Sequence, residues 1–272
     1  LSLFSTGQST EIDSMRQLLP RQIGVTRLYT LLGLAYQLYG YSIDDAHRYA
    51  LEALKEAKKN KNKPGEKHAL TLIGEYYYNL SDTKKAREFL RQADQISLKD
   101  GGKLYTAYNY VIAANIYLGE PNIDSAKVCF EKALKLLEYE NHYEIKYYSY
   151  FCYASLLFDQ NQLDDSKKIL EDLYASAVIN HATTNQAELL TELGVIENKR
   201  DEYKKAYTYL MQAEPLLPKN TYSYVKFNYL YHLANIEFNM GNNAAAITQL
   251  KAVLSIKEIE QYQDIKADMN IL

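Results

Sequence analysis

Apolar residues recur along this chain at helical spacing, and short polar segments interrupt them at regular intervals. The pattern begins with Tyr29, Leu32 and Tyr36, which lie three and four residues apart and so share one face of a helix. The interruptions are rich in Asn, Asp, Ser and Gly, as at Ser81-Asp82, and these residues favour turns and helix N-caps. The pattern predicts amphipathic helices joined in pairs by short turns.

A small residue marks each of these pairs. The first set comes in steps of 41 and then 40 residues and consists of Gly33, Gly74, Ala114, Ala154, Gly194 and Ala234. A second set follows it twelve positions later, or thirteen in the first copy, and consists of Ala46, Ala86, Ala126, Ser166, Ala206 and Ala246. A period of a few tens of residues with one helical hairpin per unit indicates a solenoid, whose units bury their apolar faces against neighbours.

The second helix of each pair has a small-large-small pattern. It is clearest at Ala86, Leu90 and Ala93, and similar triplets follow in later units. Small side chains at two crossing points let two helix axes approach closely, and the large residue between them fills the seam. A bulky substitution at a small position is therefore expected to overpack the hairpin.

This pattern resembles the tetratricopeptide repeat (TPR) family, whose helix-turn-helix unit has small residues at its eighth, twentieth and twenty-seventh positions and aromatics at its eleventh and twenty-fourth. Tyr36, Tyr77 and Tyr117 occupy the eleventh position and Phe130 the twenty-fourth. The family's early Trp is missing, because the chain has no Trp. The resemblance implies an all-α, right-handed α-α superhelix of six repeats over residues 25–258. HEAT repeats share the longer period, but they lack this placement of small residues.

The two ends of the chain carry separate expectations. Residues 1–24 are expected to hold a leader and an N-terminal capping helix from Glu11 to Leu19. Leu1 to Ser9 fits either the tail of an apolar secretory segment, with a small-residue pair before a cleavage point, or a disordered leader. Residues 259–272 resemble the opening helix of a truncated seventh repeat, since one more period from Ala234 reaches position 274.

Composition and motifs argue against catalysis. The net charge of −3 and the pI near 6.0 disfavour a nucleic-acid partner, which would need a basic stripe. The five His residues fall in different units, without His-Glu-x-x-His or Cys-x-x-Cys, so we expect no catalytic residue, metal site or cofactor. The longest apolar stretch is far short of the roughly 20 residues of a bilayer span. Cys129 and Cys152 are expected to be free thiols.

The resemblance also implies where a partner would bind, because in TPR proteins the first helices line a concave groove with their second, fifth, ninth, twelfth and thirteenth positions. Asn side chains both donate to and accept from a peptide backbone, and aromatic rings supply contact area at low entropy cost. We therefore predict that a protein or extended peptide binds there. The candidate residues are Tyr78, Asn79, Tyr108, Asn115, Tyr148, Phe151, Ser155, Asn198, Tyr231 and Asn235.

Two further features qualify this groove. Its inward positions also include Glu75 and Glu188, whereas none of the fifth positions is a Lys or Arg, so the cationic clamp of chaperone-binding relatives is absent. The simpler alternative for any one of these Asn and Tyr residues is that it is solvated or bridges adjacent helices.

For the wider setting, the chain resembles the extracytoplasmic TPR region of membrane-tethered signalling proteins of Bacteroidetes. We expect the sensor or interaction region of a larger bacterial signal-transduction or transcription-regulatory protein, in the periplasm, with a membrane tether beyond Leu272 and room for a homodimer. The alternative is a stand-alone cytoplasmic scaffold or peptide-sensing regulator. An enzyme is the third and least supported reading.

Overall fold

The computed structural model describes residues 7–38, 42–96, 102–217 and 224–254. Over these residues the protein is all-α, with thirteen α-helices, two short 3-10 helices and no strand, which confirms the predicted fold class. The described residues divide into two compact units, one spanning Gly7–Leu156 and the other beginning at Leu157. Each unit has its own succession of antiparallel helical pairs.

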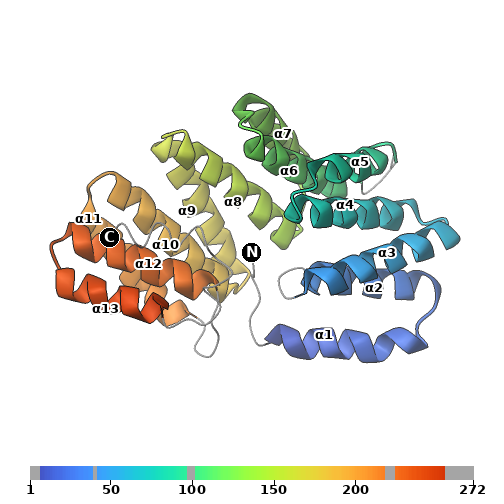
Figure 1. The fold of residues 1–272 in the computed structure, drawn as a ribbon, viewed down its shortest axis with the longest axis horizontal. Helices are drawn as coiled ribbons and strands as arrows, with labels where there is room; N and C mark the ends of the chain where they lie inside the picture. The colour runs from blue at the N-terminus through green and yellow to red at the C-terminus, as the bar shows by residue number, and fades with distance from the viewer. Residues whose placement is uncertain (1–6, 39–41, 97–101, 218–223, 255–272) are drawn as a thin grey trace. The chain divides into compact units, whose positions relative to one another are not determined.

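The Gly7–Leu156 unit begins with a single helix, continues through three hairpins and ends within a further first helix (Figure 1). In each hairpin the first helix packs on the second, and α2, α4 and α6 also pack on one another in sequence. The elements are α1 (Gly7–Leu18), a 3-10 helix (Leu19–Arg21), α2 (Gly24–Leu38), α3 (Ile43–Lys59), α4 (Lys63–Asn79), α5 (Thr83–Asp94), α6 (Lys103–Gly119), α7 (Ile123–Leu137) and most of α8 (Tyr143–Asp159).

In the second unit, α10 packs against α9, α11 and α12, and α12 packs against α13 (Figure 1). The segment predicted to open a seventh repeat, residues 259–272, lies outside the described residues. The elements of this unit are the end of α8, α9 (Leu163–Ile179), α10 (Thr183–Lys199), α11 (Tyr203–Ala213), a 3-10 helix (Glu214–Leu216), α12 (Tyr224–Asn239) and α13 (Asn243–Leu254).

The small residues lie where helices come closest. A Cβ added to Gly74 of α4 would stand 2.8 Å from Leu90 Cδ2 of α5. A Cβ on Gly194 of α10 would overlap Leu210 Cδ1 and lie 3.1 Å from the carbonyl oxygen of Ala206, both on α11. Close approach of the two helices of a hairpin therefore requires the small residue, as the sequence predicts.

The turn inside each hairpin is also repeated. Ser81, Asn161, Asp201 and Gly241, spaced by multiples of 40 residues, all have left-handed backbone conformations with φ between 58° and 83°. After Ser81, the N–H of Asp82 donates to the carbonyl of Tyr77 at 2.9 Å, and the Asp82 carboxylate then accepts from the N–H of Lys85 at 3.1 Å. The first bond closes α4 and the second caps α5. Ser81, with its left-handed backbone, and Asp82, with these two bonds, therefore end one helix and begin the next.

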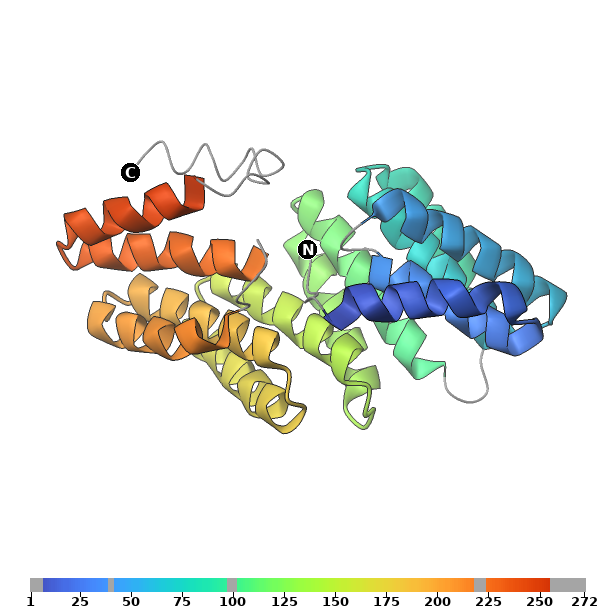
Figure 2. The same ribbon diagram turned by 90° about the horizontal axis from the view of Figure 1, so that it is seen from below.

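Helix α1 covers the first hairpin by packing on α2 (Figure 2). Gly33 of α2 faces α1 here, because a Cβ at Gly33 would stand 2.7 Å from Met15 Cε. Ile12 and Leu19 are buried in the same contact. The sequence predicts a capping helix from Glu11 to Leu19, and α1 in this region begins at Gly7 and ends at Leu18. Gly7 to Ser9, assigned to the leader from sequence, belong to α1, and residues 1–6 lie outside the described residues.

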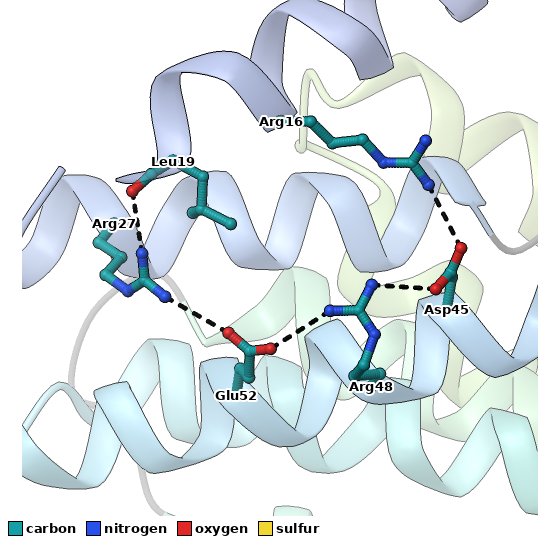
Figure 3. A network of polar contacts seen from close by, with 6 residues as sticks. All are labelled: Arg16, Leu19, Arg27, Asp45, Arg48 and Glu52. Carbon is teal, nitrogen blue, oxygen red and sulfur yellow. Dashed lines mark hydrogen bonds and ion pairs between the residues drawn. The ribbon is translucent and has the colours of Figure 1, made fainter. Parts of the chain in front are cut away.

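A chain of polar contacts ties this cap to α2 and α3 (Figure 3). Arg16 of α1 reaches Asp45 at 3.3 Å, and Arg48 bridges Asp45 and Glu52 at 2.9 and 3.4 Å. Arg27 closes the chain between Glu52 at 3.4 Å and the carbonyl of Leu19 at 2.9 Å. Because these ionic side chains are 29 to 52 % exposed, each pair contributes at most about 1 kcal/mol, and apolar burial holds the cap.

One buried polar group crosses the interior of the Gly7–Leu156 unit. Asn109 of α6 is 2 % exposed, and its amide donates to the Leu90 carbonyl at 2.9 Å and to the Asp94 carboxylate at 2.8 Å. Its oxygen lies 3.1 Å from the Thr71 hydroxyl of α4. Asn109 thus fixes α6 against both helices of the preceding hairpin, and its polar atoms are satisfied.

Candidate functional site

Four of the predicted binding residues meet on the first helices of the Gly7–Leu156 unit. The same two repeat positions are in contact in two consecutive pairs of first helices. One is the position directly after the small residue, and the other, on the next first helix, is six positions before its small residue. Tyr108 of α6 donates its hydroxyl to Glu75 Oε2 of α4 at 2.6 Å. Asn115 of α6 donates its amide to the Tyr148 hydroxyl of α8 at 3.2 Å. The Tyr108 and Tyr148 rings pack edge to face with centroids 6.0 Å apart.

Glu75 is the electrostatic centre of this group. It is only 5 % exposed, and among the described residues its carboxylate forms no ion pair with a Lys, Arg or His. Burial raises the pKa of Glu75 to about 8, an effect that the hydrogen bond from Tyr108 partly opposes. The carboxyl group is therefore largely protonated at neutral pH.

Tyrosines surround this carboxyl group. Burial raises the pKa of Tyr36 on α2, and the nearby Glu75 charge raises it further. Burial also raises the pKa of Tyr78, with smaller contributions from Cys152 and Glu75. Unlike Glu75 and Tyr108, the side chains of Tyr36, Tyr78, Asn115 and Tyr148 are half-buried. We call Tyr36, Glu75, Tyr78, Tyr108 and Tyr148 the tyrosine–glutamate cluster; it has a buried acid and a partly exposed aromatic periphery.

The remaining predicted residues of this unit bond locally. Asn79 donates its amide to the Glu75 carbonyl one turn earlier at 2.9 Å, and the Ser155 hydroxyl donates to the Phe151 carbonyl at 3.1 Å. The Phe151 ring stacks on Tyr147 of the same helix at 5.7 Å. Of these three predicted residues, only Ser155 is exposed.

The predicted residues of the second unit have different neighbours. Asn198 of α10 accepts from the Asn239 amide of α12 at 2.9 Å. Tyr231 packs beside the small apolar cluster of Phe227 and Val253, and Asn235 is half-buried on α12. The structure therefore gathers Tyr78, Tyr108, Asn115 and Tyr148 closely, and it does not assemble a comparable group from Asn198, Tyr231 and Asn235 among the residues described in this unit.

A second buried acidic position occurs in this unit. Glu192 of α10 accepts from the Asn228 amide of α12 at 2.9 Å. Burial raises the pKa of Glu192 to about 7, and the charge of Glu188 one turn earlier adds to the increase, while the Asn228 bond opposes it. Glu188 itself is 5 % exposed. Each unit thus places carboxyl groups in a poorly solvated position on a first helix.

Glu75 is the residue that sequence reasoning undervalued. The sequence places Glu75 at an inward position of the repeat, but the candidate binding residues do not include it. Its place directly after Gly74 gave the only signal, since a residue beside the closest helix crossing has little access to water.

Neither a metal-ligand group nor a membrane-spanning helix occurs within the described ranges. No group of three or more His, Cys, Asp or Glu side chains there is arranged to hold a metal ion. None of the helices in the described part of the chain combines the length and the apolar character that crossing a bilayer requires.

Comparison with known proteins identifies the repeats. The family model for the tetratricopeptide repeat matches residues 68–100, 107–136 and 227–259. Curated proteins gave no match to this sequence.

Solved structures of TPR-like proteins share the fold. NprR in complex with its cognate peptide NprX has a TM-score of 0.63 at 16% identity, covering 98% of this chain and 78% of its own. The Rap conjugation gene regulator of plasmid pLS20, in complex with the Phr* peptide, has a TM-score of 0.60 at 13% identity, covering 96% and 77%. A tetratricopeptide repeat protein from Parabacteroides merdae ATCC 43184 has a TM-score of 0.57 at 13% identity, covering 96% and 91%. The chain therefore carries tetratricopeptide repeats in both of its units, within an all-α fold of the TPR-like kind.

Proposed function

We propose that this chain is a non-catalytic module that binds an extended peptide, or an extended segment of a protein, along the inward positions of its first helices. The observation that carries the proposal is the tyrosine–glutamate cluster, whose half-buried Tyr side chains come from α2, α4 and α8, together with the half-buried Asn115 of α6 that bonds to it. Such side chains supply contact area and hydrogen bonds to a peptide backbone with little loss of conformational entropy. Two similarly folded proteins, NprR and the pLS20 Rap regulator, were solved with bound peptides, which supports this choice of ligand.

The wider setting belongs to the same proposal. The module serves as the sensor or interaction region of a larger bacterial signal-transduction or transcription-regulatory protein, outside the cytoplasm and tethered to a membrane. Hairpins that contact only their neighbours can adjust their packing when a ligand binds, and this gives the module a means of passing on a signal. Fractionation of the full-length protein entirely with the cytosol would contradict this setting and favour a cytoplasmic scaffold.

Peptide binding can be tested with defined probes. The purified chain is incubated with a pool of random decapeptides whose ends are acetylated and amidated, bound peptides are identified by mass spectrometry, and enriched sequences are measured by fluorescence anisotropy. We expect saturable binding that Asn115→Ala weakens at least about fivefold, because this amide donates to the Tyr148 hydroxyl of the cluster. Glu131→Ala on α7 is the matched control, since Glu131 is exposed. The absence of saturable binding, or equal effects of the two variants, would refute the proposal.

A further inference from the structure

The tyrosine–glutamate cluster has an acid at its centre and no base. Glu75 is 5 % exposed, and its one hydrogen-bond partner in the described structure is the uncharged hydroxyl of Tyr108. Burying a carboxyl group without a cation costs free energy, which the protein limits by keeping the group protonated. A single hydroxyl donor does not compensate a carboxylate, so the cluster would gain stability from a positive charge supplied from outside.

Arg27 and Lys199, the Arg and Lys at inward positions of the repeats, do not supply that charge. Arg27 of α2 bonds to the Leu19 carbonyl and to Glu52, within the network that holds the N-terminal cap. In the other unit, taken by itself, Lys199 donates to the Phe158 carbonyl at 3.2 Å and lies 4.1 Å from the centre of the Phe158 ring. The positive charges at inward positions are thus already engaged, whereas the acid is not paired.

The aromatic surroundings also select for a cation. Tyrosine ring faces carry negative potential and attract ammonium and guanidinium groups, more strongly where water is excluded. Tyr78 and Tyr148 are half-buried, and burial and the neighbouring Cys152 thiol raise the pKa of Tyr148, so both hydroxyls stay neutral near pH 7. Binding of an anionic ligand group would be unfavourable here, because that group would lie next to the Glu75 carboxyl group and the negative faces of the Tyr rings.

We infer that Glu75 is a specificity-determining residue that receives the cationic side chain, Lys or Arg, of an extended peptide bound along α4, α6 and α8. This inference rests on the proposed function and adds the chemical class of its ligand. Tyr78 and Tyr148 turn aside to admit the side chain, and Tyr108 keeps its hydrogen bond to Glu75 Oε2, which leaves Oε1 for the cation. Binding stabilises the ionised carboxylate in an ion pair, so a chain whose Glu75 is protonated releases that proton to solvent when the peptide binds.

Glu192 in the second unit repeats the arrangement in outline. Its carboxyl group has an amide partner, Asn228, and the other group that shifts its pKa is a second acid, Glu188. This supports a ligand with basic rather than acidic character, but the specificity test is best made at Glu75, where the surrounding aromatics are most numerous.

The test uses two decapeptide pools with acetylated and amidated ends, in which one central residue is fixed as Arg or as its neutral analogue citrulline and all other positions are uncharged. We expect the wild-type chain at pH 8 to bind the Arg pool about tenfold more tightly than the citrulline pool. Glu75→Gln is expected to bring this ratio close to one. Glu88→Gln, an exposed position on α5, is expected to leave it unchanged.

A pH series separates recognition from a structural effect of the substitution. Because Glu75 must lose its proton to form the ion pair, the preference of the wild-type chain for Arg is expected to increase from pH 6 to pH 8. Burial and the Glu75 charge raise the pKa values of Tyr36 on α2, Tyr78 on α4, Tyr108 on α6 and Tyr148 on α8, and these phenols stay neutral in this range. The Cys152 thiol of α8 lies beside Tyr78 and Tyr148. Both pools are measured on the folded wild-type chain, so the series does not depend on the variant folding.

The outcomes are distinct. An Arg preference that is independent of pH in the wild type, or that survives in Glu75→Gln, would overturn the role of Glu75 and leave peptide binding intact. Equal binding of both pools by the wild type would have the same meaning. Failure of the wild type to bind either pool would overturn the proposed function itself, and this inference with it.

Discussion

The buried acid of the tyrosine–glutamate cluster should make the stability of this protein depend on pH in an unusual direction. The Glu75 carboxyl group titrates near 4.5 when unfolded and has a pKa raised to about 8 in the folded protein. Between these values the folded state holds a proton that the unfolded chain has released, so the free energy of unfolding falls as pH rises. At 1.36 kcal/mol per pH unit, the loss from this group reaches roughly 4 kcal/mol by pH 7.4.

Glu75→Gln isolates this contribution. Glutamine is neutral at every pH, has nearly the same shape, and its side-chain oxygen can accept the hydrogen bond from Tyr108. We therefore expect the variant to become more stable than the wild type as pH rises, with the difference growing by up to about 1.4 kcal/mol per unit between pH 5 and pH 8. Below pH 5 the two proteins should be similar. Glu88→Gln, at an exposed position on α5, should show no such trend.

Urea unfolding followed by circular dichroism at 222 nm, at pH 5, 6, 7 and 8, measures the difference. Because a repeat chain can unfold in stages, hydrogen exchange of the α4 and α6 amides provides the local value beside the global one. A variant that is less stable than the wild type by a constant amount across this range would refute the reasoning. An NMR titration placing the Glu75 carboxyl midpoint near 4.5 would do so independently.

Three further perturbations test the packing. Gly194→Ala should lower the free energy of unfolding by about 1–3 kcal/mol, because the added methyl overlaps α11. Gly119→Ala, where the added methyl meets no atom within 4 Å, should be neutral or slightly stabilising. Thermal denaturation of the two variants tests this difference. Asn109→Ala should lower the free energy of unfolding, measured in urea, by about 2–3 kcal/mol, because it removes hydrogen-bond partners from groups on α4 and α5. A decrease under about 0.5 kcal/mol would contradict the role of Asn109 as a link between hairpins. Lys167→Met should lower the free energy of unfolding by about 2 kcal/mol, because it removes the ammonium group that lies 2.7 Å from the buried Glu197 carboxylate. An unchanged midpoint of urea unfolding would show that this ion pair does not stabilise the fold.

Much of the fold follows from local pattern. The spacing of Gly74 and Ala86 predicts two helices that cross closely, and the structure places them on α4 and α5 with Leu90 in the seam. The turn residues predict both helix ends, and Asp82 is observed as the N-cap of α5. These features depend on residues that are close together in the chain, so they can be predicted from short segments of the sequence.

The candidate site was predicted only in part. The inward positions implied by the TPR resemblance include Tyr108 and Tyr148, which the structure brings together. Sequence did not indicate that Tyr108 would be 5 % exposed and bonded to Glu75. Nor did it indicate that Asn109, one position along, would be the buried polar link between hairpins. These partners lie 15 to 38 residues apart in the chain.

The periodicity of the sequence alone determined the helices, the hairpins and the small residues at their crossings. In each repeat the apolar and small residues recur at helical spacing, and this spacing defines the face on which each helix packs. The tertiary structure decided which polar side chains are buried and what they touch, because that depends on how far one first helix slides along the next. A shift of a single turn, about 5.4 Å, would give Glu75 a different partner while leaving every hairpin intact.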